Sequence, residues 1–311
     1  MINTLTLNPA IDKILYVDRF VKNVTTRIIE QKETLGGKGT HVSLNLSFMG
    51  KGSRAFGICF GGTGDKIIGM MKKNNIDVCF MKKDRDGADS RTNYLINERS
   101  GDSTLITERG EMLLKEDLSE LKNLMSRKIV KNDFLVFSGD ASNYKNSFVY
   151  NDIMDALAHL ELKVFIDTSG KALKNCLKAK PFLIKPNLDE LEVLCERKIS
   201  CEISDIVCAI DSLNQYEIPC VAVSLGEEGS IVRYYDEYYR VIAPKVRAVN
   251  TVGCGDCYLS GLLYGFESEM DIRSTLAHAT AYSAACALVE DSVGFDACAE
   301  NLKNQVRIEK L

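Results

Sequence analysis

Short apolar runs alternate with amphipathic helical patterns through most of this 311-residue chain, and this alternation constrains the fold more than any other feature. Runs that are apolar throughout suit strands covered on both faces, as in a parallel sheet, and the patterns between them have the length of connecting helices. A repeated βαβ order predicts a three-layer α/β/α domain. The expected strands are residues 134–137, 163–167, 182–184 and 220–224, and the expected helices are residues 146–159, 187–195 and 204–216.

Two stretches interrupt this alternation. Residues 14–34 and 91–107 carry strand-like residues with no long helix, and Ser100-Gly101-Asp102 has the composition of a hairpin turn. Such insertions predict a small β-sheet lid over a site, with edge strands of the main sheet as the alternative. Because no repeat or Pro/Gly-rich linker is found, we expect one domain over residues 1–311, with lid strands inserted at about 14–34 and 91–107.

Composition and charge exclude several classes of protein. A formal net charge of −4 gives no electrostatic basis for binding nucleic acid. Many of the 11 cysteines lie in apolar runs, which favours reduced thiols in a cytoplasmic protein over a secreted disulfide scaffold. The first residues lack the pattern of a signal peptide, and no apolar run reaches the roughly 18 residues of a membrane span.

The glycine-rich segment 250–257, Asn-Thr-Val-Gly-Cys-Gly-Asp-Cys, carries the most chemical information. Gly253 and Gly255 allow a tight turn and a close approach to a ligand. The helical pattern over residues 258–266 predicts a helix N-terminus there, which favours an anion and keeps Asp256 ionised. A carboxylate beside an anion-binding turn suits a kinase, in which the carboxylate takes the hydroxyl proton. Alone, the motif also fits an ordinary capped helix start.

Cys254 and Cys257 form a Cys-x-x-Cys pair within this segment. A structural zinc site would need a second pair of ligands at suitable spacing, and the sequence offers none. A redox pair remains open, but we interpret both residues as small buried side chains flanking the Gly-Asp pair.

A second glycine-rich turn, Leu35-Gly-Gly-Lys-Gly39, precedes a helical pattern over residues 40–49. Lys38 would add a cation at a helix N-terminus, which suits phosphate or sugar oxygens. The turn matches neither a Walker A loop nor the Gly-x-Gly-x-x-Gly spacing of a dinucleotide-binding fold.

Two more segments follow expected strands. In Lys185-Pro-Asn-Leu-Asp-Glu190, Asn187 and Glu190 fit a capping box, or a site near magnesium-bound phosphates with water between. In 224–230, Gly226 and Gly229 could admit a nucleotide or simply form a hairpin.

Taken in order, these segments resemble the ribokinase-like, PfkB-type carbohydrate kinases over nearly the whole chain. The opening Thr6-Leu-Asn-Pro-Ala-Ile-Asp12 is most similar to the branch of 1-phosphofructokinase and tagatose-6-phosphate kinase. The matching segments are 8–12, 36–39, 185–190, 224–226 and 251–256.

The resemblance implies an α/β/α body with a β-lid, ATP and Mg²⁺ as cofactors, and phosphorylation of a sugar hydroxyl. It implies Asp256 as the catalytic base, with Gly253, Cys254 and Gly255 in the anion hole. The implied ATP-facing residues are Lys185, Asn187, Ser224, Gly226 and Gly229, with Glu190 near magnesium through water. The implied sugar-side residues are Asp12, Gly37, Lys38, His41, Arg91, Asn93, Ser138 and Asp140, with Arg27 a weaker candidate. Ordinary surface positions are an equal alternative for Arg27 and Asn93.

The departures from the family pattern lie mostly on the sugar side. His41 stands where the branch has Asn, Ser138-Gly-Asp140 stands where it has Ser-Gly-Ser, and residues 108–112 lack a Gly-Pro pair. On the nucleotide side, Cys254 and Cys257 replace small residues such as Ala and Ser.

We therefore expect a kinase for a phosphorylated ketohexose, with fructose 1-phosphate the first choice and tagatose 6-phosphate the next. A kinase for an unphosphorylated sugar or nucleoside is the alternative if His41 and Asp140 replace phosphate contacts with hydroxyl contacts. A catalytically silent sensor is the third reading, and the retained Asp256 speaks against it. The expected partners are a sugar or sugar phosphate and ATP, with no nucleic acid or membrane, and pairing through the lid would give a homodimer.

Overall fold

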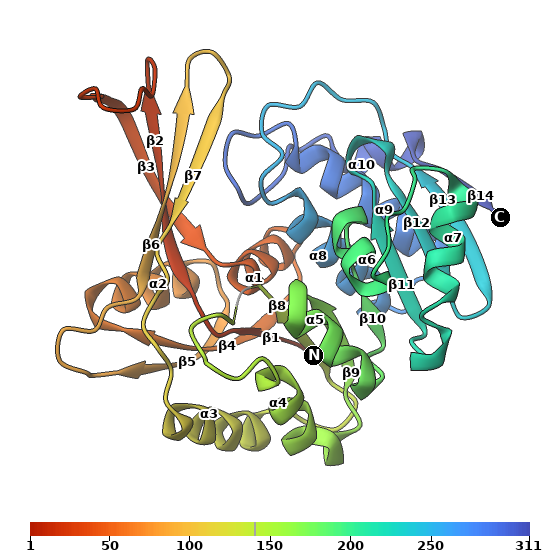
Figure 1. Ribbon diagram of the computed structural model, residues 1–311, viewed down its shortest axis with the longest axis horizontal. Coiled ribbons are helices and arrows are strands. Elements are labelled where there is room, and N and C mark those ends of the chain that lie inside the picture. Colours follow the sequence, from red (N-terminus) through yellow and green to blue (C-terminus); the bar gives the residue numbers. More distant parts are fainter. Residues whose placement is uncertain (140) are drawn as a thin grey trace.

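The strands of the computed structural model, which describes residues 1–139 and 141–311, form two sheets (Figure 1). The main sheet has the order β14-β13-β12-β11-β10-β9-β8-β1-β4-β5. In chain order its strands are β1 (Ile2–Thr6), β4 (Ser53–Phe60), β5 (Asp77–Lys83), β8 (Phe134–Ser138), β9 (Lys163–Asp167), β10 (Leu183–Ile184), β11 (Cys220–Ser224), β12 (Ser230–Tyr234), β13 (Glu237–Ile242) and β14 (Arg307–Lys310).

The centre of the main sheet is parallel. Strands from β11 through β1 to β5 pair in parallel, while β12, β13 and β14 form an antiparallel edge. The chain enters at β1, moves out through β4 to β5, and then returns to β8 on the other side of β1. In open α/β sheets, ligands bind beyond the carboxyl ends of the strands at such a reversal. The topology therefore points to the region next to β1 and β8.

Helices cover both faces of this sheet. Strand residues alternate between them: Leu135 and Phe137 of β8 pack into one core, and Phe134 and Val136 pack into the other. One face carries α3 (Lys115–Lys128), α4 (Val149–Leu157), α5 (Gly170–Cys176), α6 (Leu188–Cys195) and α7 (Ile203–Asp211), and the other carries α1 (Lys38–Phe48), α2 (Gly61–Lys73), α8 (Cys254–Glu267), α9 (Ile272–Cys286) and α10 (Ala299–Leu302). This confirms the predicted α/β/α fold.

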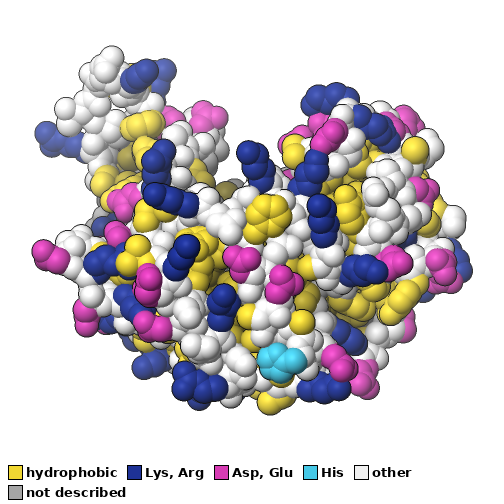
Figure 2. All heavy atoms as spheres, turned by 60° about the horizontal axis from the view of Figure 1, so that its bottom comes forward, with side chains coloured by type: hydrophobic (Ala, Val, Ile, Leu, Met, Phe, Trp, Pro, Cys, Tyr) yellow, Lys and Arg dark blue, Asp and Glu magenta, His cyan; other side chains and the backbone are white. Residues whose placement is uncertain are grey.

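The second, smaller sheet has the order β3-β2-β6-β7 and projects from the body at the upper left of Figure 1. Its strands are β2 (Ala10–Val17), β3 (Ile28–Gly36), β6 (Arg91–Glu98) and β7 (Ser103–Thr107). The strand-like segments 14–34 and 91–107 both contribute to it, although β2 starts earlier than expected. Figure 2 shows the molecular surface hollowed between this sheet and the carboxyl-terminal part of the body.

The start of α8 differs from the prediction in a way that matters for Asp256. The pattern over residues 258–266 suggested a start near Tyr258, but α8 begins at Cys254, so Asp256 lies in its first turn. Small and polar residues hid this first turn from the apolar pattern. Among the described residues, no helix is long and apolar enough to cross a membrane.

Candidate active site

The candidate site lies where two helix N-termini meet the carboxyl ends of parallel strands. Ser138 ends β8, Asp167 ends β9, Lys185 follows β10 and Ser224 ends β11. Two helices that cover one face of the sheet begin here: α1 begins at Lys38, and α8 has Asp256 in its first turn. The first amides of a helix lack intrahelical partners and carry partial positive charge, so this convergence suits an anion.

Gly253 is required by the turn that starts α8. It is the N-cap residue, and its φ of 87° is a left-handed conformation that glycine adopts without strain. A Cβ atom at this position would lie 1.8 Å from the carbonyl oxygen of Ser292, so no side chain fits. The turn can therefore bring the α8 amides close to a ligand.

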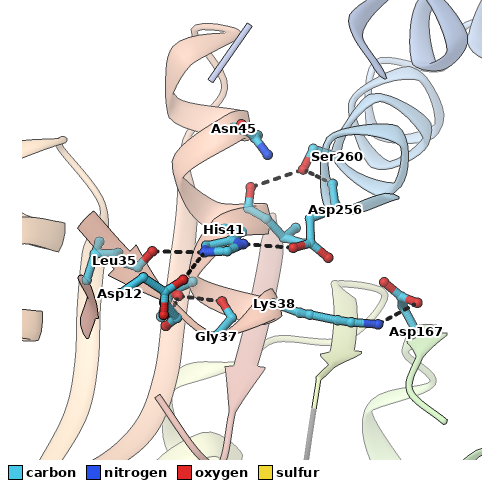
Figure 3. Close-up of polar contacts among 12 residues, drawn as sticks. Asp12, Leu35, Gly37, Lys38, His41, Asn45, Asp167, Asp256 and Ser260 are labelled. Atoms are coloured by element: carbon cyan, nitrogen blue, oxygen red, sulfur yellow. Dashed lines mark hydrogen bonds and ion pairs between the residues drawn. The ribbon is translucent and has the colours of Figure 1, made fainter. Parts of the chain in front are cut away.

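The carboxylate of Asp256 is held by His41, a contact that the sequence analysis did not predict (Figure 3). Asp256 is 6% exposed and His41 is 5% exposed. The Nδ1 atom of His41 lies 2.8 Å from Oδ2 of Asp256, and Nε2 lies 2.8 Å from the carbonyl oxygen of Leu35. A second carboxylate, that of Asp12, lies 3.7 Å from Nε2. His41 therefore lies between two acidic groups.

This environment favours the charged form of the His41 ring. Burial by itself lowers the pKa of a histidine, but the contacts with Asp12 and Asp256 raise the pKa of His41 to about 10. A pKa in this range favours the imidazolium form at neutral pH.

Asp12 is oriented by the small sheet. The side-chain amide of Asn93, on β6, donates to Oδ1 of Asp12 at 2.7 Å, and the two residues are paired across β2 and β6. A Cβ atom on Gly36 would lie 2.0 Å from the same Oδ1, so glycine makes room for the carboxylate. Asn93 is buried, which excludes the surface alternative considered for it.

Lys38 points away from Asp12 and toward Asp167 (Figure 3). Its Nζ atom lies 3.8 Å from Oδ1 of Asp167, and Nζ of Lys185 lies 3.2 Å from the same atom. The charge of Asp167 raises the pKa of Lys38 above its usual value, against the effect of burial, and Asp256 and Glu190 contribute in the same direction. Lys38, Lys185 and Asp167 therefore come together between the sugar-side and the nucleotide-side residues.

A cavity of about 510 Å³ extends from this region along α8 and α9. Its walls include small apolar residues such as Ala243, Pro244 and Ala284, which suit a flat aromatic ring. The nucleotide-side residues expected from the sequence that line it are Asn187, Ser224, Gly226, Gly229, Cys254 and Gly255. Lys185 is buried next to it, and its Nζ would lie 3.5 Å from a Cβ atom on Gly255.

Asn187 and Glu190 form the capping box that the sequence suggested. Oδ1 of Asn187 accepts from the Glu190 amide at 2.7 Å, and Oε2 of Glu190 accepts from the Asn187 amide at 3.0 Å. The structural reading of this motif is thus confirmed. The charge of Glu190 also contributes to the raised pKa of Lys38.

The two cysteines of the Cys-x-x-Cys pair have different environments. Cys257 is buried, and its thiol donates to the carbonyl oxygen of Tyr282 at 3.3 Å. Cys254 is half-buried, so the expectation of two buried residues is wrong for it. Contact with the thiol of Cys286 and burial raise the pKa of the Cys254 thiol, which disfavours the reactive thiolate.

Two of the other sugar-side candidates, Arg91 and Gly37, lie beside the same carbonyl oxygen of Asn8. Arg91 donates from Nε to the carbonyl oxygen of Asn8 at 3.0 Å at the base of the small sheet, and Gly37 is the N-cap residue of α1. Ser138 is buried at the end of β8, Arg27 is exposed before β3, and Asp140 lies outside the described residues.

Asp167 is a site residue that the sequence analysis missed. It is 1% exposed, and neither carboxylate oxygen accepts a hydrogen bond from the described residues. The available signal was a carboxylate at the end of an expected parallel strand, which is the usual place for a ligand-binding side chain. No comparable signal predicts the pairing of His41 with Asp256, which are 215 residues apart.

The chain is similar in sequence to known carbohydrate kinases. Residues 5–295 match the model of the pfkB family of carbohydrate kinases. The tagatose-6-phosphate kinase of Staphylococcus epidermidis is 30% identical over 284 residues, which cover 91% of this chain and 90% of that protein. The 1-phosphofructokinase of Borreliella burgdorferi is 30% identical over 312 residues, covering 100% and 99%.

Solved structures show the same fold. Phosphofructokinase-2 from Escherichia coli in complex with potassium has a TM-score of 0.91 at 21% identity, over 98% of each chain. The tetrameric inhibited form of that enzyme has a TM-score of 0.88 at 22% identity, also over 98% of each chain.

Proposed function

Because the chain belongs to the pfkB family of carbohydrate kinases and is therefore a sugar kinase, we propose that it transfers the γ-phosphoryl group of ATP to a hydroxyl of a phosphorylated ketohexose. Fructose 1-phosphate is the first candidate and tagatose 6-phosphate the next. The names of the two relatives at 30% identity, a tagatose-6-phosphate kinase and a 1-phosphofructokinase, support this substrate class.

The observation that carries the proposal is the position of Asp256. Its buried carboxylate lies in the first turn of α8, between the Asp12 side of the site and the 510 Å³ cavity. Oδ2 contacts His41, so Oδ1 would take the proton of the attacking hydroxyl. The amides at the start of α8, together with Lys38 and Lys185, would offset the negative charge of the transferred phosphoryl group.

We assign the cavity to ATP, because it joins an apolar region suited to a base with the glycine turn suited to phosphates. For Mg²⁺, the carboxylate oxygens of Asp167 are hard oxygen donors that fit the ion. They accept no hydrogen bond from the described residues, although Oδ1 lies 3.2 Å from Nζ of Lys185, and the charge of Glu190 acts on the neighbouring Lys38. Asp167 and Glu190 would hold the ion with phosphates and water supplying the other ligands. When bound, Mg²⁺ would neutralise charge on the phosphate oxygens.

On the sugar side, Asp12, oriented by Asn93, would accept hydrogen bonds from sugar hydroxyls. Arg91, at the base of the small sheet, is the proposed contact to the sugar phosphate, because a guanidinium binds phosphate strongly and directionally. Lys38 extends toward Asp167, and we therefore assign it to the transferred phosphoryl group rather than to the phosphate of the sugar.

A coupled assay of ADP release tests the substrate class. We expect turnover with fructose 1-phosphate or tagatose 6-phosphate, Mg²⁺ and ATP, and much slower turnover with free fructose. Faster turnover with free fructose would overturn the phosphosugar assignment, and absence of sugar-dependent ADP release would overturn the proposed reaction.

We further propose that the small sheet is a lid within a single domain, and that two lids pair to form a homodimer. Large apolar side chains on its edge strands face solvent, with exposed fractions of 51% for Ile28, 53% for Ile29, 56% for Leu105 and 47% for Ile106. Exposed apolar side chains on both edge strands would be covered if two such sheets packed together. The doubly substituted protein Ile29→Glu/Leu105→Glu should have the mass of a monomer by light scattering. The control Val130→Glu, at an exposed apolar position on the body, should have the same mass as wild type. A monomeric wild type would contradict this proposal.

A further inference from the structure

We propose that His41 is a cationic positioning residue that holds the general base Asp256 and the sugar-side Asp12, and that it does not contact the substrate. This inference rests on the proposed function and changes one expectation of the sequence analysis, in which His41 is a substrate-binding residue.

The hydrogen bonds of His41 define its protonation. The carbonyl oxygen of Leu35 can only accept, so Nε2 carries a proton. An ionised Asp256 can also only accept, so Nδ1 carries a proton whenever Asp256 is competent as a base. The arrangement that can catalyse the reaction therefore contains an imidazolium and a carboxylate. With both ring nitrogens engaged by protein atoms, His41 has no polar atom left for a sugar.

The charges around His41 support the same conclusion. The ionisable groups that face the ring are Asp12 on β2 and Asp256 on α8, and they raise the pKa of His41 to about 10. Without a cation between them, these carboxylates would repel each other and the phosphoryl group that must approach Asp256. A neutral asparagine could replace one hydrogen bond of His41 but not its charge.

His41 also connects two parts of the molecule. Asn93 and Asp12 lie on the small sheet, whereas Asp256 lies on α8 of the body, and the imidazole of His41 lies between them (Figure 3). The orientation of the base is thus tied to the residue proposed to hold the sugar. Restricting Asp256 to one rotamer would keep Oδ1 directed at the reacting hydroxyl, which is the role of an orienting group in general-base catalysis.

Nuclear magnetic resonance of the wild-type protein labelled with ¹⁵N-histidine tests the charge directly. The chain has three histidines, so the His159→Asn and His41→Asn variants assign the signals. We expect the ring of His41 to remain protonated on both nitrogens at pH 8, where an ordinary histidine is neutral. In Asp256→Asn the same ring should lose a proton at lower pH. Titration of the His41 ring in wild type near the ordinary pKa of about 6.5 would overturn the proposal.

Kinetics test the positioning role. In His41→Asn and His41→Ala, kcat should fall about 10- to 100-fold, as expected for loss of a charge-assisted hydrogen bond, with the KM for ATP unchanged within about threefold. His159→Asn, altered at an exposed site, should match wild type.

A steep rise in the sugar KM at unchanged kcat would instead show direct sugar binding by His41 and would overturn the proposal. Melting curves establish that each variant is folded, and the titration of the wild-type ring decides the matter even if the variants are unstable. If wild type lacks sugar kinase activity, the proposed function fails. The charge of His41 is still measured by the nuclear magnetic resonance titration, which does not depend on activity.

Discussion

At the level of single residues, the site depends on pairing each carboxylate with a cation. Asp256 and Asp12 share His41, and Asp167 lies between Lys38 and Lys185. Buried carboxylates without such partners would be protonated or destabilising. The pairing places a cationic side chain beside each of these three carboxylates before the highly charged phosphates arrive.

We predict that Asp256→Asn abolishes most turnover while ATP binding stays within a few-fold of wild type. The amide keeps the size of the side chain but cannot take a proton, and loss of a general base costs about 10²- to 10⁴-fold in rate. ADP release and ATP titration calorimetry measure the two effects. Near-normal turnover in this variant would remove Asp256 from its assigned role.

At the level of elements, the small sheet brings sugar-side residues to the body. Strand β6 begins with Arg91 and contains Asn93, which is paired with Asp12 on β2. The far end of the sheet carries apolar and charged residues that do not reach the site. Substitutions at its base should therefore change the KM of the sugar, whereas substitutions at its tip should leave it unchanged.

We predict that Arg91→Ala raises the KM of the phosphorylated sugar roughly 10- to 100-fold and leaves the affinity for ATP almost unchanged. A hydrogen bond to a charged group contributes about 1.5–3 kcal/mol. Arg99→Ala, on the same sheet with an exposed ion pair to Asp18, is the matched control and should behave as wild type. Because Arg91 also donates to the Asn8 carbonyl oxygen, melting temperatures should accompany the kinetics. An unchanged sugar KM would argue against a phosphate contact.

At the level of the whole molecule, two buried histidines make stability depend on pH in opposite directions. The pKa of His41 is raised to about 10, so its contribution is complete below pH of about 6.5 and is lost as the pH rises toward 10. Burial, with a smaller effect of the Lys303 charge, lowers the pKa of His278 to about 4. Its ring packs between Tyr264 and Tyr282, and its contribution is complete above pH of about 6.5 and is lost as the pH falls toward 4.

We therefore predict that the free energy of unfolding is highest near pH 6.5 and declines on both sides. Denaturant unfolding from pH 5 to pH 9.5 measures this profile. His41→Asn should flatten the alkaline decline, although the variant is less stable at pH 7, and His278→Gln should flatten the acidic decline. His159→Asn should change neither limb. Equal slopes in wild type and His41→Asn above pH 7 would show that His41 is not charged in the folded state.

Local patterns in the sequence were sufficient to predict the α/β/α body and several chemical groups. Uninterrupted apolar runs can only be buried on both faces, so strands such as residues 134–137 and 220–224 were predictable, as was the capping box of Asn187 and Glu190. The glycine turn before Asp256 was also predictable, because the backbone conformation that requires glycine is a local property of the chain.

Only the tertiary structure decided which of these groups meet. Asp12 and His41 lie within the first 41 residues and Asp256 lies 215 residues after His41, yet the imidazole contacts both carboxylates. Likewise, Lys38 at the start of α1 lies 3.8 Å from Asp167 at the end of β9, a pairing that no local pattern indicates. Charge and hydrogen bonding act over a few ångströms in space and are independent of separation along the chain. The sequence by itself therefore determined the elements and the types of candidate catalytic group, and the packing of α1 and α8 against the sheet decided their partners.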